Sequence, residues 1–117
     1  MRIAINPDGT IFNRYWTRET QGDYDTETFG SLVDGAKEGM KGLKAAGNYI
    51  IIHTVRVNPE VNKYRTVDEL KQNVAAALKL QEIPFDEIWT GTGLPDADLF
   101  IGDDAYTFFD WETVDLI

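Results

Sequence analysis

The sequence contains no cysteine and a single histidine, and these absences exclude several kinds of site. Without cysteine there is no disulfide framework, no thiolate metal site and no cysteine nucleophile. A single histidine also excludes a metal centre that is built from several imidazoles. Any catalytic or binding chemistry must therefore come from carboxylates, hydroxyls, amides and a few basic side chains.

Basic residues and long apolar runs are also scarce. The 117 residues include 20 Asp and Glu but only 11 Lys and Arg, which gives a formal net charge of -9. Such acidity disfavours binding to nucleic acid or to an anionic membrane, since both require basic side chains. The apolar run at residues 49–52, like the others in the chain, is too short to cross a bilayer, and no segment resembles a signal peptide. We therefore expect a soluble cytoplasmic protein that binds neither nucleic acid nor membrane.

The apolar content is nevertheless sufficient for one folded domain. Hydrophobic residues make up 43% of the chain, and no repeat or linker divides residues 1–117 into smaller units. An acidic domain that handles phosphate needs a metal ion, or backbone N–H groups, between its carboxylates and the ligand.

Short apolar strands alternate with amphipathic helices along the chain. The residues Thr66 and Glu69 form a capping box, which predicts the start of one helix. This alternation is typical of β-α-β units with a parallel sheet. The long stretch at about 11–31 predicts a flap, or a loop whose aromatic residues cover the edge of the core. The pattern predicts strands at 2–6, 48–54, 86–90 and 98–101, helices at about 32–46 and 66–81, and a last strand or turn at 106–109.

Polar residues follow each of the predicted strands. In parallel α/β sheets, ligands bind at the carboxyl ends of the strands, so these residues are expected to converge on one site. They are Asn6 and Asp8 after the first strand, Thr54 after the second, Thr90 and Thr92 after the third, and Asp103 and Asp104 after the fourth.

The run from Asn6 to Thr10 (NPDGT) resembles the D-x-D-G-T signature of the haloacid-dehalogenase-like (HAD) phosphatases. Three later segments agree with that family in order: the apolar strand that ends in Thr54, the region 86–98, and the strand that leads to Asp103. The chain is most similar to small members without a cap domain. The resemblance implies a three-layer, Rossmann-like α/β fold with a parallel sheet in the order 3-2-1-4-5.

The resemblance also implies roles for individual residues. The family's first motif Asp is the nucleophile and a Mg²⁺ ligand, and Asn6 stands at that position. Asp8 takes the place of the general acid/base, and Thr54 that of the residue that binds phosphoryl oxygens. The fourth motif implies that Asp103 and Asp104 hold the metal, so the implied Mg²⁺ site consists of Asn6, Asp8, Asp103 and Asp104.

Three departures from the family pattern predict weak or absent catalysis. The carboxamide of Asn6 is neutral and a poor nucleophile. The Lys of the third motif G-K-P is Leu94 here, which offers no charge to a phosphoryl group. Gly102 occupies the first acidic position of the fourth motif, unless a shift by one residue aligns Asp103 and Asp104 as the acidic pair. Magnesium binding, which depends on carboxylates, is therefore expected to be weakened.

Four residues are candidates for contact with a phosphate: Gly9, Thr10, Thr54 and Arg56. Arg56, like Lys63 and Arg65, follows the second strand and would replace the missing Lys, or would simply face solvent. The neighbouring His53 is interpreted as a histidine of the core.

Three functions fit these features. The leading hypothesis is a HAD-like domain with a degenerate site that binds a phosphorylated or nucleotide-like molecule, or a protein partner, without efficient turnover. The first alternative is an atypical Mg²⁺-dependent phosphohydrolase that acts on a small phosphate ester. The second is a protein-interaction module that docks through the aromatic residues Phe12, Tyr15 and Trp16.

Overall fold

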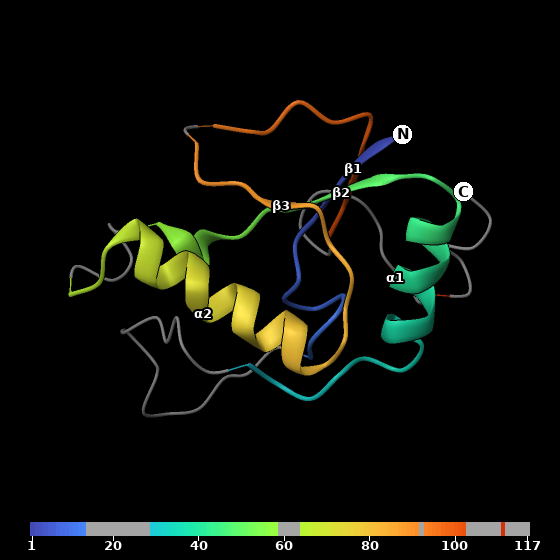
Figure 1. Ribbon diagram of the computed structural model, residues 1–117, viewed down its shortest axis with the longest axis horizontal. Coiled ribbons are helices and arrows are strands. Elements are labelled where there is room, and N and C mark those ends of the chain that lie inside the picture. Colours follow the sequence, from blue (N-terminus) through green and yellow to red (C-terminus); the bar gives the residue numbers. More distant parts are fainter. Residues whose placement is uncertain (14–28, 59–63, 92, 103–110, 112–117) are drawn as a thin grey trace.

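The predicted parallel sheet is present in the computed structural model, which describes residues 1–13, 29–58, 64–91, 93–102 and 111 (Figure 1). Its strands are β1 (Arg2–Ile5), β2 (Tyr49–Ile52), β3 (Glu87–Ile88) and β4 (Leu99–Ile101). They lie in the order β3-β2-β1-β4, and all neighbours are parallel. This confirms the first four places of the expected order. The fifth strand, predicted at 106–109, lies outside the described residues.

In the described part of the chain, two helices and one turn of 3₁₀ helix connect the strands. They are α1 (Ala36–Ala45), η1 (Val55–Val57) and α2 (Val67–Leu80). The capping box is confirmed, because the Thr66 hydroxyl accepts from the Glu69 N–H and the Glu69 carboxylate accepts from the Thr66 N–H. Within the described part of the chain, no helix has the length and apolar character needed to span a membrane.

The first helix begins later than predicted. Leu32 forms a bridge with Phe12, and the Val33 N–H donates to the Ile11 carbonyl at 2.8 Å. These bonds hold residues 32 and 33 in extended conformation beside the turn that follows β1. The chain enters α1 only after Gly35, whose φ of 80° is a left-handed conformation that favours glycine.

Both helices pack on one face of the sheet. Alternation along the parallel strands places Ile3, Ile5, Ile50 and Ile52 on this face, and all four are fully buried. In Figure 1 the two helices lie below the strands. The helices add further core side chains: Ala36, Met40 and Leu43 from α1, and Leu70, Val74 and Leu78 from α2.

The opposite face of the sheet is covered by the connection between β3 and β4. Arg2, which shares this face with the buried Ala4 and Ile51, donates from Nε to the carbonyl of Asp96 at 2.8 Å. The described residues of this connection, drawn in orange above the strands in Figure 1, include no helix. The described residues therefore do not show the helix expected on the second face of a three-layer fold.

The described ends of the predicted loop at 11–31 belong to the core. Phe12 is 2% exposed, and its ring lies 4.9 Å from the ring of Phe29 between centroids. The interpretation that aromatics cover the core edge is confirmed for these two residues. The prediction that Phe12 belongs to a docking surface is wrong, because its ring is buried. Residues 14–28, with Tyr15 and Trp16, lie outside the described residues.

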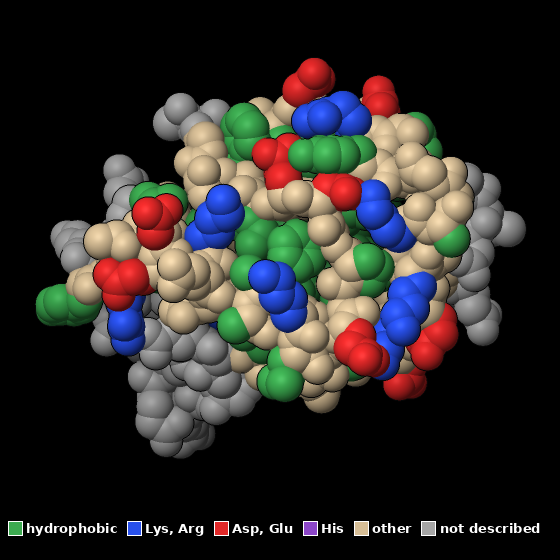
Figure 2. Space-filling view, viewed as in Figure 1, with side chains coloured by type: hydrophobic (Ala, Val, Ile, Leu, Met, Phe, Trp, Pro, Cys, Tyr) green, Lys and Arg blue, Asp and Glu red, His purple; other side chains and the backbone are tan. Residues whose placement is uncertain are grey.

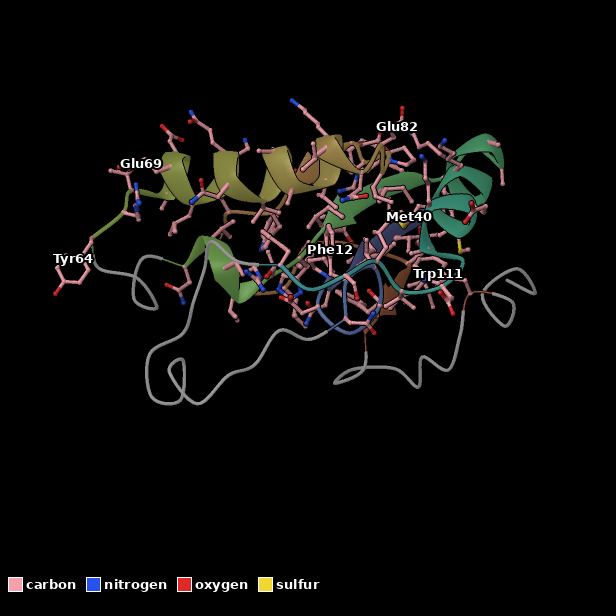
Figure 3. All side chains as sticks on the ribbon, turned by 90° about the horizontal axis from the view of Figure 1, so that it is seen from below. Phe12, Met40, Tyr64, Glu69, Glu82 and Trp111 are labelled. Atoms are coloured by element: carbon pink, nitrogen blue, oxygen red, sulfur yellow. The ribbon has the colours of Figure 1, made fainter. Side chains whose placement is uncertain are left out.

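Trp111 joins the end of the chain to the first helix and to the first turn. Its indole is buried against Gly39 of α1, and its Nε1 donates to the Thr10 carbonyl at 2.8 Å (Figure 3). A Cβ at position 39 would lie 2.4 Å from Trp111 Cε3. The helix therefore needs glycine here to admit the indole ring.

We predict opposite effects for two glycine substitutions in α1. Gly39→Ala is expected to lower the free energy of unfolding by about 1–3 kcal/mol, because its methyl group collides with Trp111. Gly42→Ala is the matched control: no described atom lies within 4 Å of its Cβ position, so higher helix propensity should raise stability by about 0.5–1 kcal/mol. Urea unfolding measures both. Equal effects would contradict the packing described for Trp111.

Candidate functional site

The described polar residues that follow the strands lie at one edge of the sheet, as predicted, while Thr92 lies outside the described residues. The Asn6 N–H donates to the carbonyl of Ile101, the last residue of β4, at 2.9 Å. Gly102 packs against Asn6, since a Cβ at 102 would lie 3.3 Å from Asn6 Cβ. Thr54 follows β2 at the same edge, and Thr90 follows β3. The first and fourth motif regions are thus adjacent, while Asp103 and Asp104 themselves lie outside the described residues.

The turn after β1 is closed by its own hydrogen bonds. The Asp8 N–H donates to Asn6 Oδ1 at 3.1 Å, and the buried Thr10 hydroxyl donates to the Asn6 carbonyl. The Gly9 N–H, at a left-handed φ of 87°, donates to the Phe12 carbonyl at 2.7 Å. Three N–H groups then share the Pro7 carbonyl: Thr10 at 3.4 Å, Ile11 at 3.0 Å and Phe12 at 2.9 Å. The donors at Gly9 and Thr10 that we expected to meet a phosphate are therefore already used within the turn.

A buried ion pair joins this turn to the segment after β2. Arg56 Nε donates to Asp8 Oδ2 and Arg56 Nη2 donates to Asp8 Oδ1, both at 2.9 Å. The two residues are 3% and 5% exposed. The ring of Phe29 lies 4.0 Å from the guanidinium carbon, a cation–π contact. Bidentate, charge-assisted hydrogen bonds of this kind are strong and fix the orientation of both groups.

The position of Arg56 follows from the local backbone. Thr54 ends the extended segment after β2, and its side-chain oxygen accepts from the Arg56 N–H at 3.2 Å, which caps η1. The turn directs Arg56 back toward Asp8, so the interpretation of a solvated Arg56 is wrong. Contact between Arg56 and a phosphate stays a prediction. Arg65 is exposed and pairs with Glu69, and Lys63 lies outside the described residues.

An open pocket of about 590 Å³ lies at the carboxyl edge of β2 and β3, beside Thr54. Its described polar lining is uncharged at neutral pH, because burial lowers the pKa of His53 below its usual 6.5. His53 is partly exposed at this wall, which corrects the expectation of a core histidine. Sequence reasoning also missed Trp89, although it precedes Thr90 at the end of a predicted strand. The polar and aromatic lining consists of His53, Thr54, Asn58, Trp89 and Thr90.

The described residues do not assemble a metal site. Among them, no three Asp, Glu or His side chains lie close enough together to hold an ion. Asn6 Oδ1 accepts from the Asp8 N–H, and both Asp8 oxygens accept from Arg56. Magnesium prefers carboxylate and water oxygens. The side-chain oxygens of Asn6 and Asp8, which already accept hydrogen bonds, therefore suit it poorly as ligands. A Mg²⁺ site that includes Asp103 and Asp104 stays a prediction.

Comparison with known proteins supports the fold. No protein-family model and no curated protein matches the chain. A solved structure of a conserved protein from Bacteroides thetaiotaomicron is similar, with a TM-score of 0.65 and 23% sequence identity. The similarity covers 97% of this chain and 85% of that one. At this level of sequence identity, such a likeness shows a shared fold and nothing about function.

We predict that Asp8 and Arg56 are energetically coupled. Asp8→Asn and Arg56→Met should each lower the free energy of unfolding by about 3–5 kcal/mol, because each breaks the bidentate ion pair of a charge that stays buried. The double variant should cost clearly less than the sum of the two. Arg65→Met, in an exposed pair, is the control and should cost under about 1 kcal/mol. Additive losses in denaturant unfolding would show that the pair is not formed.

The single histidine gives a second prediction that NMR can read from one imidazole signal. In the folded chain His53 should titrate below 6.5, and in urea it should return to about 6.5. Because the folded pKa is the lower one, the unfolded state binds the proton first. The stability that neutral His53 contributes is thus complete above pH 6.5 and declines as the pH falls toward the folded pKa. In the variant His53→Gln, the free energy of unfolding should no longer fall over this pH range. A pH dependence equal to that of the natural chain would contradict the prediction.

Proposed function

We propose that this chain is a HAD-like phosphatase-fold protein that binds a small phosphorylated or nucleotide-like molecule, or a protein partner, without efficient turnover. The buried pair of Asp8 and Arg56 beside Asn6 is the observation that carries this proposal. Hydrolysis through a covalent intermediate requires a nucleophile and a general acid/base, and the arrangement of Asn6, Asp8 and Arg56 affects both.

The first of these groups is the nucleophile. In the family that the chain resembles, the side chain after the first strand attacks phosphorus. Asn6 offers an uncharged amide oxygen there, and this oxygen accepts a hydrogen bond from the Asp8 N–H at 3.1 Å. An amide oxygen is a much weaker nucleophile than a carboxylate. The geometry thus favours a structural role for Asn6 in closing the turn.

The second group is the general acid/base. Proton transfer requires a side chain within hydrogen-bond reach of the reacting atom. Both carboxylate oxygens of Asp8 are instead engaged by Arg56, in a site that is almost closed to solvent. The pair supports a function in which Asp8 and Arg56 hold two loops together, and we assign phosphoryl contact to Thr54 rather than to Arg56.

The pocket beside this pair supports binding. A volume of about 590 Å³ lies within the range of small-molecule sites. The rings of Trp89 and His53 offer stacking surfaces, and the hydroxyls of Thr54 and Thr90 offer hydrogen bonds. These groups are compatible with a nucleoside or sugar moiety that carries one phosphate.

An active, Mg²⁺-dependent phosphohydrolase is the second candidate. It is favoured by the contact of Gly102 with Asn6, because this contact places the residue that precedes Asp103 beside the nucleophile position. In this alternative Asp103 or Asp104 would contribute metal ligands, and water rather than Asn6 would attack the ester. Cytoplasmic location is part of the proposal for either candidate.

Release of phosphate from an aryl phosphate separates these candidates. We expect no Mg²⁺-dependent release by the natural chain, and a gain of weak release in the double variant Asn6→Asp with Leu94→Lys, which restores the nucleophile and the cation. The single variant Leu94→Lys is the control for added charge. Mg²⁺-dependent release by the natural chain that is lost in Asp103→Asn would refute the leading proposal and support the second candidate.

Ligand binding is tested by NMR titration with inorganic phosphate, adenosine and adenosine monophosphate. The monophosphate should shift the His53 signal and raise its pKa, because a nearby anion stabilises the imidazolium. Thr54→Val should weaken this binding by about threefold to tenfold, the value of one hydrogen bond. Ser31→Ala, an exposed hydroxyl outside the pocket, should leave it unchanged. If none of the three compounds shifts the signal, the small-molecule form of the proposal is wrong.

A further inference from the structure

A second, larger hollow lies between α2 and the edge strand β3. This groove has a volume of about 810 Å³ and is open to solvent. Figure 2 shows hydrophobic side chains in the hollow at the centre of this view, with basic side chains beside it. The apolar residues that line it are Ala75, Ile83, Pro84, Phe85, Ile88 and Trp89.

One stripe of α2 forms the helical wall of the groove. Lys71, Ala75 and Lys79 follow one another at intervals of four residues, so they lie on the same side of the helix. The small side chain of Ala75 leaves space between the two lysines. The core-facing residues Leu70, Val74 and Leu78 each precede one member of the stripe, which places the stripe next to the buried face.

The lysines of this stripe are available to a partner. Lys71 and Lys79 are exposed, and neither makes an ion pair or hydrogen bond with the part of the chain that the structure describes. Acidic residues outnumber basic ones in the chain as a whole, which has a net charge of -9. The groove thus has two lysine charges that are not paired within the described residues, next to its apolar lining.

The two acidic residues that line the groove already form ion pairs with basic side chains outside it. Both Asp86 oxygens accept from Lys44 Nζ at 2.7 Å, and Asp86 Oδ2 also accepts from the Ile50 N–H at 2.7 Å. Burial opposes ionisation of Asp86, but these bonds keep its pKa below the usual value. Glu87 lies 3.7 Å from the Arg2 guanidinium. These pairs reduce the repulsion that an acidic ligand would meet.

The strand β3 lies at the edge of the sheet. Within the described residues it pairs with β2 alone, and the bonds from the Asp86 and Trp89 N–H groups run toward β2. An edge strand presents backbone donors and acceptors to any extended segment that lies beside it. Addition of a partner strand to such an edge is a recurrent mode of peptide recognition.

We infer that this groove binds an extended acidic segment of a partner protein, which adds to β3 as a further strand beneath the Lys71–Lys79 stripe. A rise of about 1.5 Å per helical residue places the two lysines about 12 Å apart. An extended chain advances about 3.3 Å per residue, so side chains four residues apart lie about 13 Å apart on the same side. The matching segment therefore has acidic residues four apart, with an apolar residue midway to contact Ala75.

A second copy of this chain fits the groove less well. Each copy carries a charge of -9, and pairing of two β3 edges would bring the same two lysines from both copies to one junction. Like charges at such a junction are unfavourable, whereas an acidic segment neutralises them.

Titration of the full chain with three synthetic peptides tests this inference. Each capped seven-residue peptide consists of threonine with a central valine, and carries glutamate, glutamine or lysine two places on either side of that valine. NMR should show shifts at Ala75, Ile88 and their neighbours, with the glutamate peptide bound about tenfold more tightly than the lysine peptide. In the double variant Lys71→Glu with Lys79→Glu this order should reverse.

Lys41→Glu is the control, because it makes the same kind of charge change at an exposed position of α1, outside the groove lining. It should retain the preference for the glutamate peptide. An unchanged His53 signal verifies that each variant is folded. Equal affinities for the three peptides, shifts outside the groove, or no shift at all would overturn the inference. So would a dimer in sedimentation experiments that the double variant abolishes, since the occupant would then be a second copy.

Discussion

The organisation of the site depends on one interaction, the buried bidentate pair between Asp8 and Arg56. The pair spans the turn after β1 and the turn after β2, which are separated by almost half of the chain. It allows a guanidinium to remain 3% exposed beneath the ring of Phe29. Removal of either partner takes two charge-assisted hydrogen bonds away from a charge that stays buried. The closed turn that begins at Asn6 and the capped turn at Thr54 are both consistent with this requirement.

This pair links the protein's structure to its proposed function. A carboxylate that the family resemblance assigns to proton transfer is here used to hold two loops together, and the neighbouring nucleophile position is an amide. The adjacent pocket keeps neutral polar and aromatic walls. An acidic domain with this arrangement can retain a ligand without promoting attack on phosphorus. Lys71 and Lys79, which form no ion pair within the described part of the chain, lie elsewhere, on α2, in the groove for which we infer a protein partner.

Much of the sheet could be predicted, because apolar strands that alternate with helices permit few parallel arrangements. The capping box likewise located α2 through interactions local in sequence. The start of α1 could not be predicted, since the bridge of Leu32 with Phe12 and the bond from the Val33 N–H to the Ile11 carbonyl hold residues 32 and 33 extended. The Asp8–Arg56 pair also escaped prediction. The two residues are 48 positions apart, and η1 determines where Arg56 points. The sequence shows that the two side chains carry opposite charges, but it does not show that they lie in contact.

The most direct test is the hydrogen exchange of the Arg56 Nε–H, measured by NMR with and without a bound monophosphate. If Arg56 holds Asp8, this proton donates to a buried carboxylate at 2.9 Å. It should therefore exchange far more slowly than that of the exposed Arg65, and its signal should remain in place when ligand binds. Rapid exchange, or a shift that shows Arg56 leaving Asp8 for the phosphate, would contradict the account.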